Sequence, residues 1–452
     1  MTLSRMAEYL LVCVFVTLPG RSFACPLEVL VKINLTLTLL LCLPLPALAQ
    51  RPLAHPIQDS AFQQLAEVAG SQAGDDFGAS VAVSGDTLVV GLPFSSAACE
   101  NCGAVYVYLA ANGDWGNLTQ VATLTPPTGK GTGGGFGYPV AVSGDTIVVG
   151  GFDASSQEAA AYVYVNPSGN PAPAGELTTS VGTGDSVQGL GIEGGTIVVG
   201  IPTASVGARG EGAAFVYVEP STGWTDMTET AELLSTAPNT FFGQSVAISG
   251  HNIVVGAFEV KVGGVEQGAA YLFVQPAAGW SGIWSPTTEF EASNGTRKAG
   301  FGTSVSVSGE TAAVGAPDEA VGSSQNEGAA YIFSRPSSGW PKTMTETAEL
   351  TASGAKAGSE LGFSVALSRQ TMVAGAPFEH GVQGLAYLFS EPTGGWQSSS
   401  RAEAIAASDG TANDNFGYSV FIGDGVIAVG SPGWPRGSLA KDGAGYVFGK
   451  SQ

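Results

Sequence analysis

Hydrophobic and polar residues alternate in short runs along most of the chain. In residues 80–84, SVAVS, valine alternates with serine or alanine, which is the period of two expected of a β-strand with one bulky and one small face. The following Ser84-Gly85-Asp86 predicts a tight hairpin turn, because glycine readily takes a positive φ. Residues 88–90, LVV, are apolar throughout, as expected of a strand that is covered on both faces. The pattern therefore predicts an antiparallel hairpin.

This hairpin recurs seven times. Six copies begin with Phe-Gly or Leu-Gly, whereas a degenerate copy that begins at Ser186 has lost the Phe-Gly pair. The starts are 50 to 60 residues apart, at Phe77, Phe136, Ser186, Phe242, Phe301, Leu361 and Phe416. Self-similarity at such a spacing is typical of repeat proteins in which each repeat is one supersecondary unit.

Two further segments complete each copy. A loop of variable length leads to a Gly-Ala-Ala-Tyr-like segment with an aromatic residue in one slot, at Tyr106, Tyr162, Phe215, Tyr271, Tyr331, Tyr387 and Tyr446. A Pro/Gly/Ser turn follows, and in five copies it ends in tryptophan, at Trp115, Trp224, Trp280, Trp340 and Trp396. A short segment of the Ala-Glu-Leu type comes next. The strict repetition of the aromatic residues indicates packing between repeats rather than a sugar-stacking site, which would need only one or two of them.

Four strands repeated seven times predict an all-β protein, a seven-bladed β-propeller with four antiparallel strands per blade. A stack of β-helix coils is the alternative, but its repeats are far shorter. The seventh copy ends in GYVFGKSQ without a fourth strand, and a lone strand of the Ala-Glu-Leu type, residues 62–68, precedes the first copy. We therefore expect the N-terminal strand to close the last blade and to remove two exposed edges.

Phe-Gly at the start of each copy and Gly-Ala-Pro about fourteen residues later resemble the FG-GAP repeat, the unit of the integrin α-chain propeller and of many secreted bacterial proteins. Gly-Ala-Pro is intact at residues 315–317 and 375–377, and variants stand at 91–93, 200–202 and 430–432. The resemblance covers about residues 62–449. It implies a seven-bladed propeller with a role in adhesion or ligand binding.

One departure from that family concerns metal binding. Several integrin blades carry a calcium loop of the Asp-x-Asp-x-Asp-Gly type between the first two strands, and calcium takes about six to eight oxygen ligands. In four copies the same connection is only Ser-Gly-Asp, Ser-Gly-His or Ser-Gly-Glu, and Asp86 and Asp145 are interpreted as turn formers. We expect no integrin-type metal site and no cofactor.

Composition supports this fold and excludes several partners. The chain has 65 glycines, 44% hydrophobic residues and only 12% charged residues, which excludes a coiled coil and a disordered chain. The glycines do not recur at every third position, so the chain is not collagen-like. Its 17 basic and 38 acidic residues give a net charge of −21. Nucleic acid and anionic membranes are therefore excluded as partners, because both need Lys and Arg to neutralise phosphate.

The first 49 residues are expected to be a leader that ends in a secretory signal peptide. Lys32 precedes an apolar run over residues 35–48, and Ala47-Leu48-Ala49 fits a cleavage site after Ala49. This run and an earlier one at residues 10–18 are shorter than the ~20 residues that span a bilayer, so the mature chain is expected to have no transmembrane segment. Residues 1–30 are hypothesised to lie upstream of the true start, at Val31.

The resulting domain organisation is a leader over residues 1–49, a linker over 50–61 and the propeller over 62–449. Cleavage would also remove three of the five cysteines and leave Cys99 and Cys102. Since the signal directs the chain to an extracytoplasmic location (secreted, periplasmic or on the cell surface), we expect these two to form a local disulfide. Sequons at Asn117 and Asn294 bear on function only if the source glycosylates its proteins.

Candidate ligand residues lie in the variable loops. In an antiparallel blade, the connection between the second and third strands and the link to the next blade lie on one face of the disc, and here both are long and dissimilar. Variable loops on a rigid scaffold are where binding sites usually lie. The candidate ligand-binding residues are Asp153, Glu259, Asp318, Glu319, Glu379, His380 and Arg436. The plainer interpretation is that they are solvated loop residues.

The sequence therefore predicts a secreted or surface binding and adhesion module for a protein or glycan. Two alternatives remain: an extracellular polysaccharide-acting enzyme with carboxylates near the propeller axis, and a structural component of an envelope or matrix. The chain has no His-Glu-x-x-His, Gly-x-Ser-x-Gly or phosphate-binding glycine loop, so no enzymatic activity is expected.

Overall fold

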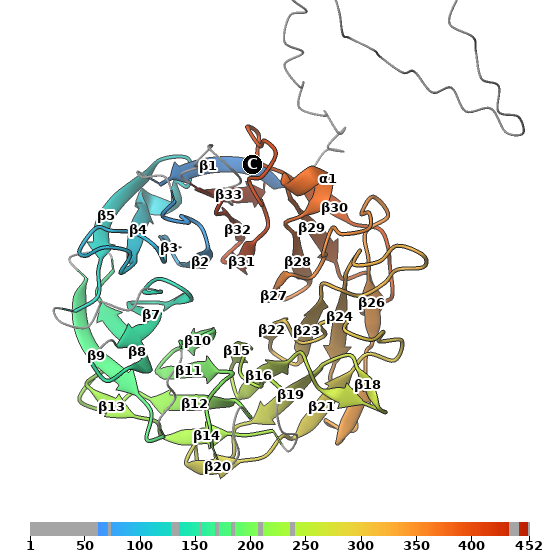
Figure 1. Ribbon diagram of the computed structural model, residues 1–452, viewed down its shortest axis with the longest axis horizontal. Coiled ribbons are helices and arrows are strands. Elements are labelled where there is room, and N and C mark those ends of the chain that lie inside the picture. Colours follow the sequence, from blue (N-terminus) through green and yellow to red (C-terminus); the bar gives the residue numbers. More distant parts are fainter. Residues whose placement is uncertain are drawn as a thin grey trace, which may run out of the picture. The chain divides into compact units, whose positions relative to one another are not determined.

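The computed structural model forms a ring of small β-sheets around a central axis (Figure 1). It describes residues 62–70, 74–127, 135–153, 155–167, 171–181, 186–206, 211–235, 240–433 and 443–450. The expected leader, its cleavage site and the linker lie outside the described residues. Within the described ranges, no helix is long and apolar enough to cross a membrane.

The described strands form seven blades, each built on four antiparallel strands. The first two blades comprise β2 (Ser80–Ser84), β3 (Thr87–Leu92), β4 (Ala104–Ala110) and β5 (Leu118–Leu124), then β6 (Val140–Ser143), β7 (Thr146–Asp153), β8 (Glu158–Val165) and β9 (Ala172–Thr178). The next two comprise β10 (Gly189–Glu193), β11 (Thr196–Ile201), β12 (Ala213–Val218) and β14 (Ala231–Leu233), then β15 (Ser245–Ser249), β16 (Asn252–Ala257), β19 (Ala269–Val274) and β21 (Thr288–Glu291).

The fifth and sixth blades comprise β22 (Ser304–Ser308), β23 (Thr311–Ala316), β24 (Ala329–Ser334) and β26 (Ala348–Leu350), then β27 (Ser364–Ser368), β28 (Thr371–Ala376), β29 (Leu385–Ser390) and β30 (Glu403–Ile405). The seventh comprises β31 (Ser419–Gly423), β32 (Val426–Ser431), β33 (Ala444–Lys450) and β1 (Phe62–Ala69). The first strands of neighbouring blades contact one another around the axis, from β2 to β31 and back to β2. The predicted seven-bladed propeller is confirmed.

Ring closure also follows the prediction. The N-terminal strand β1 pairs antiparallel with β33 and becomes the fourth strand of the last blade. In Figure 1 the blue and red ends of the colour scale therefore lie side by side. Phe62 is buried in the same cluster as Tyr446 and Phe448 of β33, so β1 contributes apolar contacts as well as main-chain hydrogen bonds.

Glycine-to-glycine contacts set the spacing of the blades. In each blade the N–H of the Phe-Gly glycine, or of Gln188 in the third blade, donates to the carbonyl of the Gly-Ala-Pro glycine at 3.0–3.1 Å. A Cβ on Gly315 would overlap the carbonyl oxygen of Gly362 in the next blade. The same contact occurs at six of the seven blade boundaries, including Gly430 against Gly78 where the ring closes. The repeated glycines are therefore required by close approach of two backbones.

The aromatic residues of each repeat pack together between blades. The ring centroids of Phe301 and Tyr331 lie 5.3 Å apart, and those of Phe416 and Tyr446 lie 5.4 Å apart. Phe301 also bridges to Gly268 of the preceding blade and belongs to a buried cluster that includes Leu272 of that blade. These contacts confirm that the repeated aromatic slot serves packing between blades.

Several blades carry an additional outer strand that the repeat pattern does not reveal. β13 (Met227–Thr228), β20 (Gly282–Trp284) and β25 (Thr343–Thr345) each come from the turn of one blade and pair in parallel with the last strand of the blade before it. They satisfy main-chain groups on edges that would otherwise be open to pairing with another chain.

Three small elements lie in the connections. They are the hairpin of β17 (Lys261–Val262) and β18 (Val265–Glu266), the 3₁₀-helix η1 (Ala111–Gly113) and the single-turn helix α1 (Glu379–Val382).

Deletion of residues 62–69 should abolish the cooperative thermal transition, because the seventh blade would lose its outer strand and expose β33. The measurement is calorimetry or circular dichroism across a temperature scan. A deletion of residues 50–61, which leaves β1 intact, is the matched control. An unchanged melting temperature without β1 would contradict the closure.

Gly315→Ala should lower the free energy of unfolding by about 3 kcal/mol, because its Cβ would meet a main-chain oxygen that cannot move without displacing the next blade. Chemical denaturation measures this change. Gly354→Ala is the control, since a Cβ there meets no atom within 4 Å, and it should change the free energy by less than about 0.5 kcal/mol. Equal effects of the two variants would disprove the spacing role of Gly315.

Candidate ligand-binding face

The two faces of the ring differ in their connections. One face, called here the turn face, carries the turn between the first and second strands and the turn between the third and fourth strands of each blade. The other, the loop face, carries the connections between second and third strands and the links between blades. The loop-face connections differ in length: the one in the second blade comprises residues 154–157, and the one in the fifth blade comprises residues 317–328. The connection of the fifth blade packs against the link at residues 292–303. Every predicted ligand residue that the structure describes belongs to the loop face.

Asp153 is buried inside its own loop. Its carboxylate accepts hydrogen bonds from the N–H of Ser155 at 2.8 Å and from the hydroxyls of Ser155 and Ser156 at 2.7 and 3.0 Å. This pattern closes a turn by capping main-chain and side-chain donors. With 2% of its surface exposed, the side chain serves as a turn former within its own loop.

Glu319 and Glu379 are also buried and tie loop-face segments together. Glu319, 1% exposed, accepts hydrogen bonds from the N–H groups of Thr296 and Ala320 at 3.0 and 3.1 Å. Glu379 accepts a hydrogen bond from the hydroxyl of Ser359 in the link between the fifth and sixth blades. Both carboxylates are enclosed by the protein's own main chain and side chains, and their assignment as ligand groups stays a prediction.

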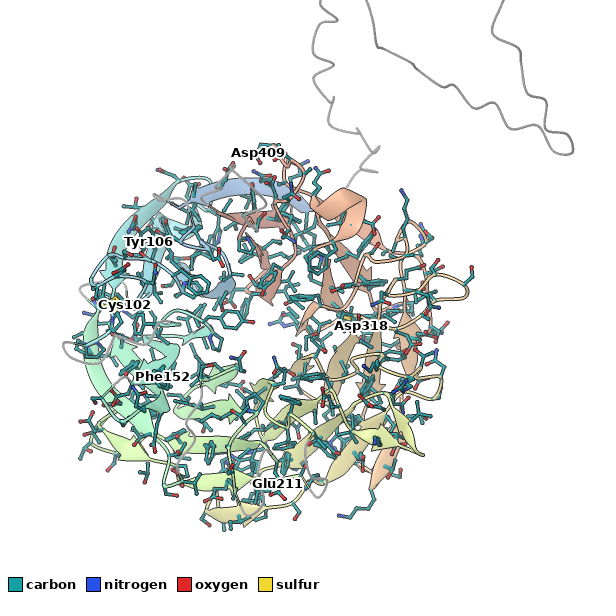
Figure 2. All side chains as sticks on the ribbon, in the orientation of Figure 1. Cys102, Tyr106, Phe152, Glu211, Asp318 and Asp409 are labelled. Atoms are coloured by element: carbon teal, nitrogen blue, oxygen red, sulfur yellow. A yellow bond between two sulfur atoms is a disulfide. The ribbon has the colours of Figure 1, made fainter. Side chains whose placement is uncertain are left out.

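Asp318 lines a cavity on the loop face. The cavity has a volume of about 510 Å³ and is lined by Thr296, Arg297, Lys298, Asp318, Ala320, Gln325 and Asn326. The Asp318 carboxylate accepts a hydrogen bond from the Asn326 amide, and burial raises its pKa above the ordinary value. Figure 2 places Asp318 across the ring from Phe152. Among the predicted ligand residues whose side chains the structure describes, Asp318 is the one that lines this cavity.

Of the remaining candidates, Glu259 does not line this cavity. Glu259 is exposed at the start of the connection that holds β17 and β18. His380 lies in α1, and its side chain is outside the described part of the structure. Arg436 also lies outside the described residues. Cys99 and Cys102 form a disulfide in the loop-face connection of the first blade, with their Cα atoms 5.5 Å apart.

The sequence patterns missed Glu360, whose carboxyl is coupled to Asp318. Burial, followed by the negative charge of Asp318, raises the pKa of Glu360 from 4.5 to about 7. Asp76 holds the equivalent position, immediately before Phe-Gly, and burial followed by the charge of Asp75 raises its pKa to about 6. Both residues have a positive φ. The available signal was an acidic residue directly before a Phe-Gly or Leu-Gly pair, where asparagine, phenylalanine or glycine stands in the other copies that keep the pair.

A second hollow lies near the ring closure. It has a volume of about 370 Å³, and its lining includes Glu67, Asp409, Asp414 and Tyr446. The Tyr446 hydroxyl donates a hydrogen bond to Asp409 at 3.0 Å. Neither here nor elsewhere in the described ranges are three His, Cys, Asp or Glu side chains grouped so as to hold a metal ion.

Comparison with known families matches the repeats found in the sequence. The family model described as FG-GAP repeat matches residues 69–108, 118–164, 229–273, 284–333, 344–389 and 400–448, which together are more than half of the chain. The longest unmatched segment within the ring, residues 165–228, contains the first three strands of the third blade, whose copy has neither Phe-Gly nor Leu-Gly. A search of curated proteins finds no match to this chain.

Glu360→Gln should change the pH dependence of stability. Because the pKa of Glu360 is raised in the folded state, folding favours the protonated carboxyl, and stability is lost as the pH rises from about 4.5 through about 7. The variant should therefore match the parent at pH 4 and have a higher melting temperature at pH 8. Thermal scans between pH 4 and 8 measure this difference.

Glu259→Gln, at an exposed glutamate of the same face, is the control and should follow the parent at every pH. Parallel pH profiles for the parent and Glu360→Gln would show that Glu360 titrates alike in the folded and unfolded chains.

Proposed function

Because the chain belongs to the FG-GAP repeat family, we propose that it is an extracytoplasmic binding and adhesion module that holds a protein or glycan ligand on its loop face. The ring supplies a rigid support, and the loop face supplies connections that differ from blade to blade. Binding through such connections needs no catalytic group, metal ion or cofactor. The proposal therefore describes a scaffold with one specialised end.

The observation that carries the proposal is the contrast between the two ends of β24. At its first residue, the loop-face connection packs against the link between blades and encloses the cavity that Asp318 lines. At its last residue, the turn face begins with Arg335-Pro336-Ser337-Ser338-Gly339-Trp340, a turn that recurs with small changes in other blades. The loop-face end of β24 therefore carries features that differ from those of other blades, and a ligand specific for this protein would recognise those features.

A polysaccharide-acting enzyme is the second candidate, and the coupled carboxyls of Asp318 and Glu360 are the observation that favours it. A carboxyl whose pKa is near 7 is suited to act as a general acid. However, Glu360 is not one of the residues that line the cavity beside Asp318. The two carboxyls do not share one opening to a substrate, so a binding role is better supported.

Blocking one face at a time tests the proposal. Ser323→Cys on the loop face and Ser338→Cys on the turn face both change exposed residues of the fifth blade. In a chain without residues 1–49, the native cysteines are Cys99 and Cys102, which are bonded to each other. Each variant would be coupled to a polyethylene glycol maleimide and applied to a glycan array and to a display of extracellular proteins. The loop-face adduct should lose the ligands of the parent chain by at least 10-fold, and the turn-face adduct should keep them.

Loss of binding only in the turn-face adduct would show that the ligand binds the turn face, which contradicts the proposal. If the parent chain bound nothing in either format, the binding proposal would fail and a structural role would be favoured. Release of sugar fragments from a bound polysaccharide would instead favour the enzyme.

A further inference from the structure

The cavity beside Asp318 is unusual in its charge. The chain has 17 basic and 38 acidic residues, yet two of the basic residues, Arg297 and Lys298, are adjacent and line this one cavity. Both are exposed at its rim. Asp318 is the one carboxylate among the lining residues, and the neighbouring Glu319 carboxylate is buried, so the charged side chains exposed at the rim are cationic within a strongly acidic protein. A cationic opening in such a chain selects a particular class of anionic ligand, since the surrounding surface repels anions in general.

The two cationic residues are held by their main chain. The N–H of Lys298 donates to the carbonyl of Glu266 at 2.6 Å, and the N–H of Thr296 donates to the buried Glu319 carboxylate at 3.0 Å. Glu319 also accepts the N–H of Ala320 from the opposite wall at 3.1 Å. The buried carboxylate therefore fixes the two walls of the cavity relative to each other, and Arg297 and Lys298 extend from a braced segment.

The remaining polar groups of the cavity fit hydroxyl groups. Thr296, Gln325 and Asn326 carry both donors and acceptors, whereas an ionised Asp318 carries acceptors alone. Arginine and lysine form charge-assisted hydrogen bonds with carboxylates, and arginine does so with two parallel bonds. The lining thus offers cations for a carboxylate and, next to them, acceptors for hydroxyl protons.

Deepening the proposed function, and resting on it, we propose that this cavity binds the uronic acid units of an acidic glycan. The sugar carboxylate contacts Arg297 and Lys298, and the ring hydroxyls contact Asp318 and Asn326. An acidic peptide fits less well, because it would place carboxylates beside Asp318 without hydroxyl protons to donate. The volume of about 510 Å³ lies within the range of roughly 300–1,000 Å³ common for small-ligand pockets.

The test measures binding of the full chain to polygalacturonate, to its methyl ester and to poly-glutamate by titration calorimetry. The parent should bind polygalacturonate, with an affinity that falls as salt is added, and should not bind the methyl ester, which has lost the charge. The R297Q/K298Q variant should weaken this binding by at least about 10-fold. Lys356→Gln, at an exposed cation of the next link that does not line the cavity, is the matched control and should bind as the parent does.

Asp318→Ala separates a sugar from a peptide. Removal of both carboxylate acceptors should weaken polygalacturonate binding, whereas removal of the negative charge should strengthen binding of poly-glutamate. Melting temperatures of all variants confirm that each is folded. Weaker polygalacturonate binding together with unchanged folding supports the site.

Other outcomes overturn the inference. Equal binding of poly-glutamate and polygalacturonate would show a site for any polyanion, and an R297Q/K298Q variant that binds polygalacturonate normally would place its site elsewhere. If polygalacturonate is not bound but the loop-face adduct still blocks another ligand, this inference fails while the proposed function stands. If no ligand is bound in any format, both fail.

Discussion

The close approach of two glycine backbones at the blade boundaries is the constraint on which the rest of the structure depends. At six boundaries, the carbonyl oxygen of a Phe-Gly glycine occupies the space where a side chain would stand on a Gly-Ala-Pro glycine. The spacing of the blades is thereby set by main-chain atoms, which vary little between repeats. The boundary of the second and third blades differs, because a Cβ on Gly150 would meet Pro139 of its own blade. The third copy has no Phe-Gly pair, and Val187, which follows its first residue, is buried there.

This constraint explains why the two ends of the ring can differ. Main-chain contacts and buried aromatic pairs hold the blades, so the connections on the loop face do not have to hold the ring together. They can therefore lengthen and diverge, as in the connection at residues 317–328 of the fifth blade. The parallel pairing of β13, β20 and β25 adds to this division, because it uses turn-face segments to cover outer edges.

Neighbouring carboxylates of the loop face differ in their exposure to solvent because the connections and links of that face fold over some of them. Asp318 and Glu319 are neighbours in sequence, yet Asp318 lines a cavity and Glu319 is enclosed by hydrogen bonds from two segments. Glu360 was not recognised from the sequence, although its position before Leu361-Gly362 matches that of Asp76 before Phe77-Gly78. Its raised pKa follows first from burial and then from the negative charge of Asp318, which lies 42 positions earlier in the chain.

The sequence by itself determined the seven repeats, the strand order within a blade and the closure by residues 62–68, because each depends on local periodicity or on repetition. It also separated the variable connections from the uniform turns. Only the tertiary structure decided that Asp153, Glu319 and Glu379 are enclosed, and that Arg297 and Lys298 share a cavity with Asp318. The physical reason is that burial and charge coupling depend on how a link between blades folds against a loop of the next blade. The distance between residues of the link and residues of the loop is not encoded in any local pattern of residues.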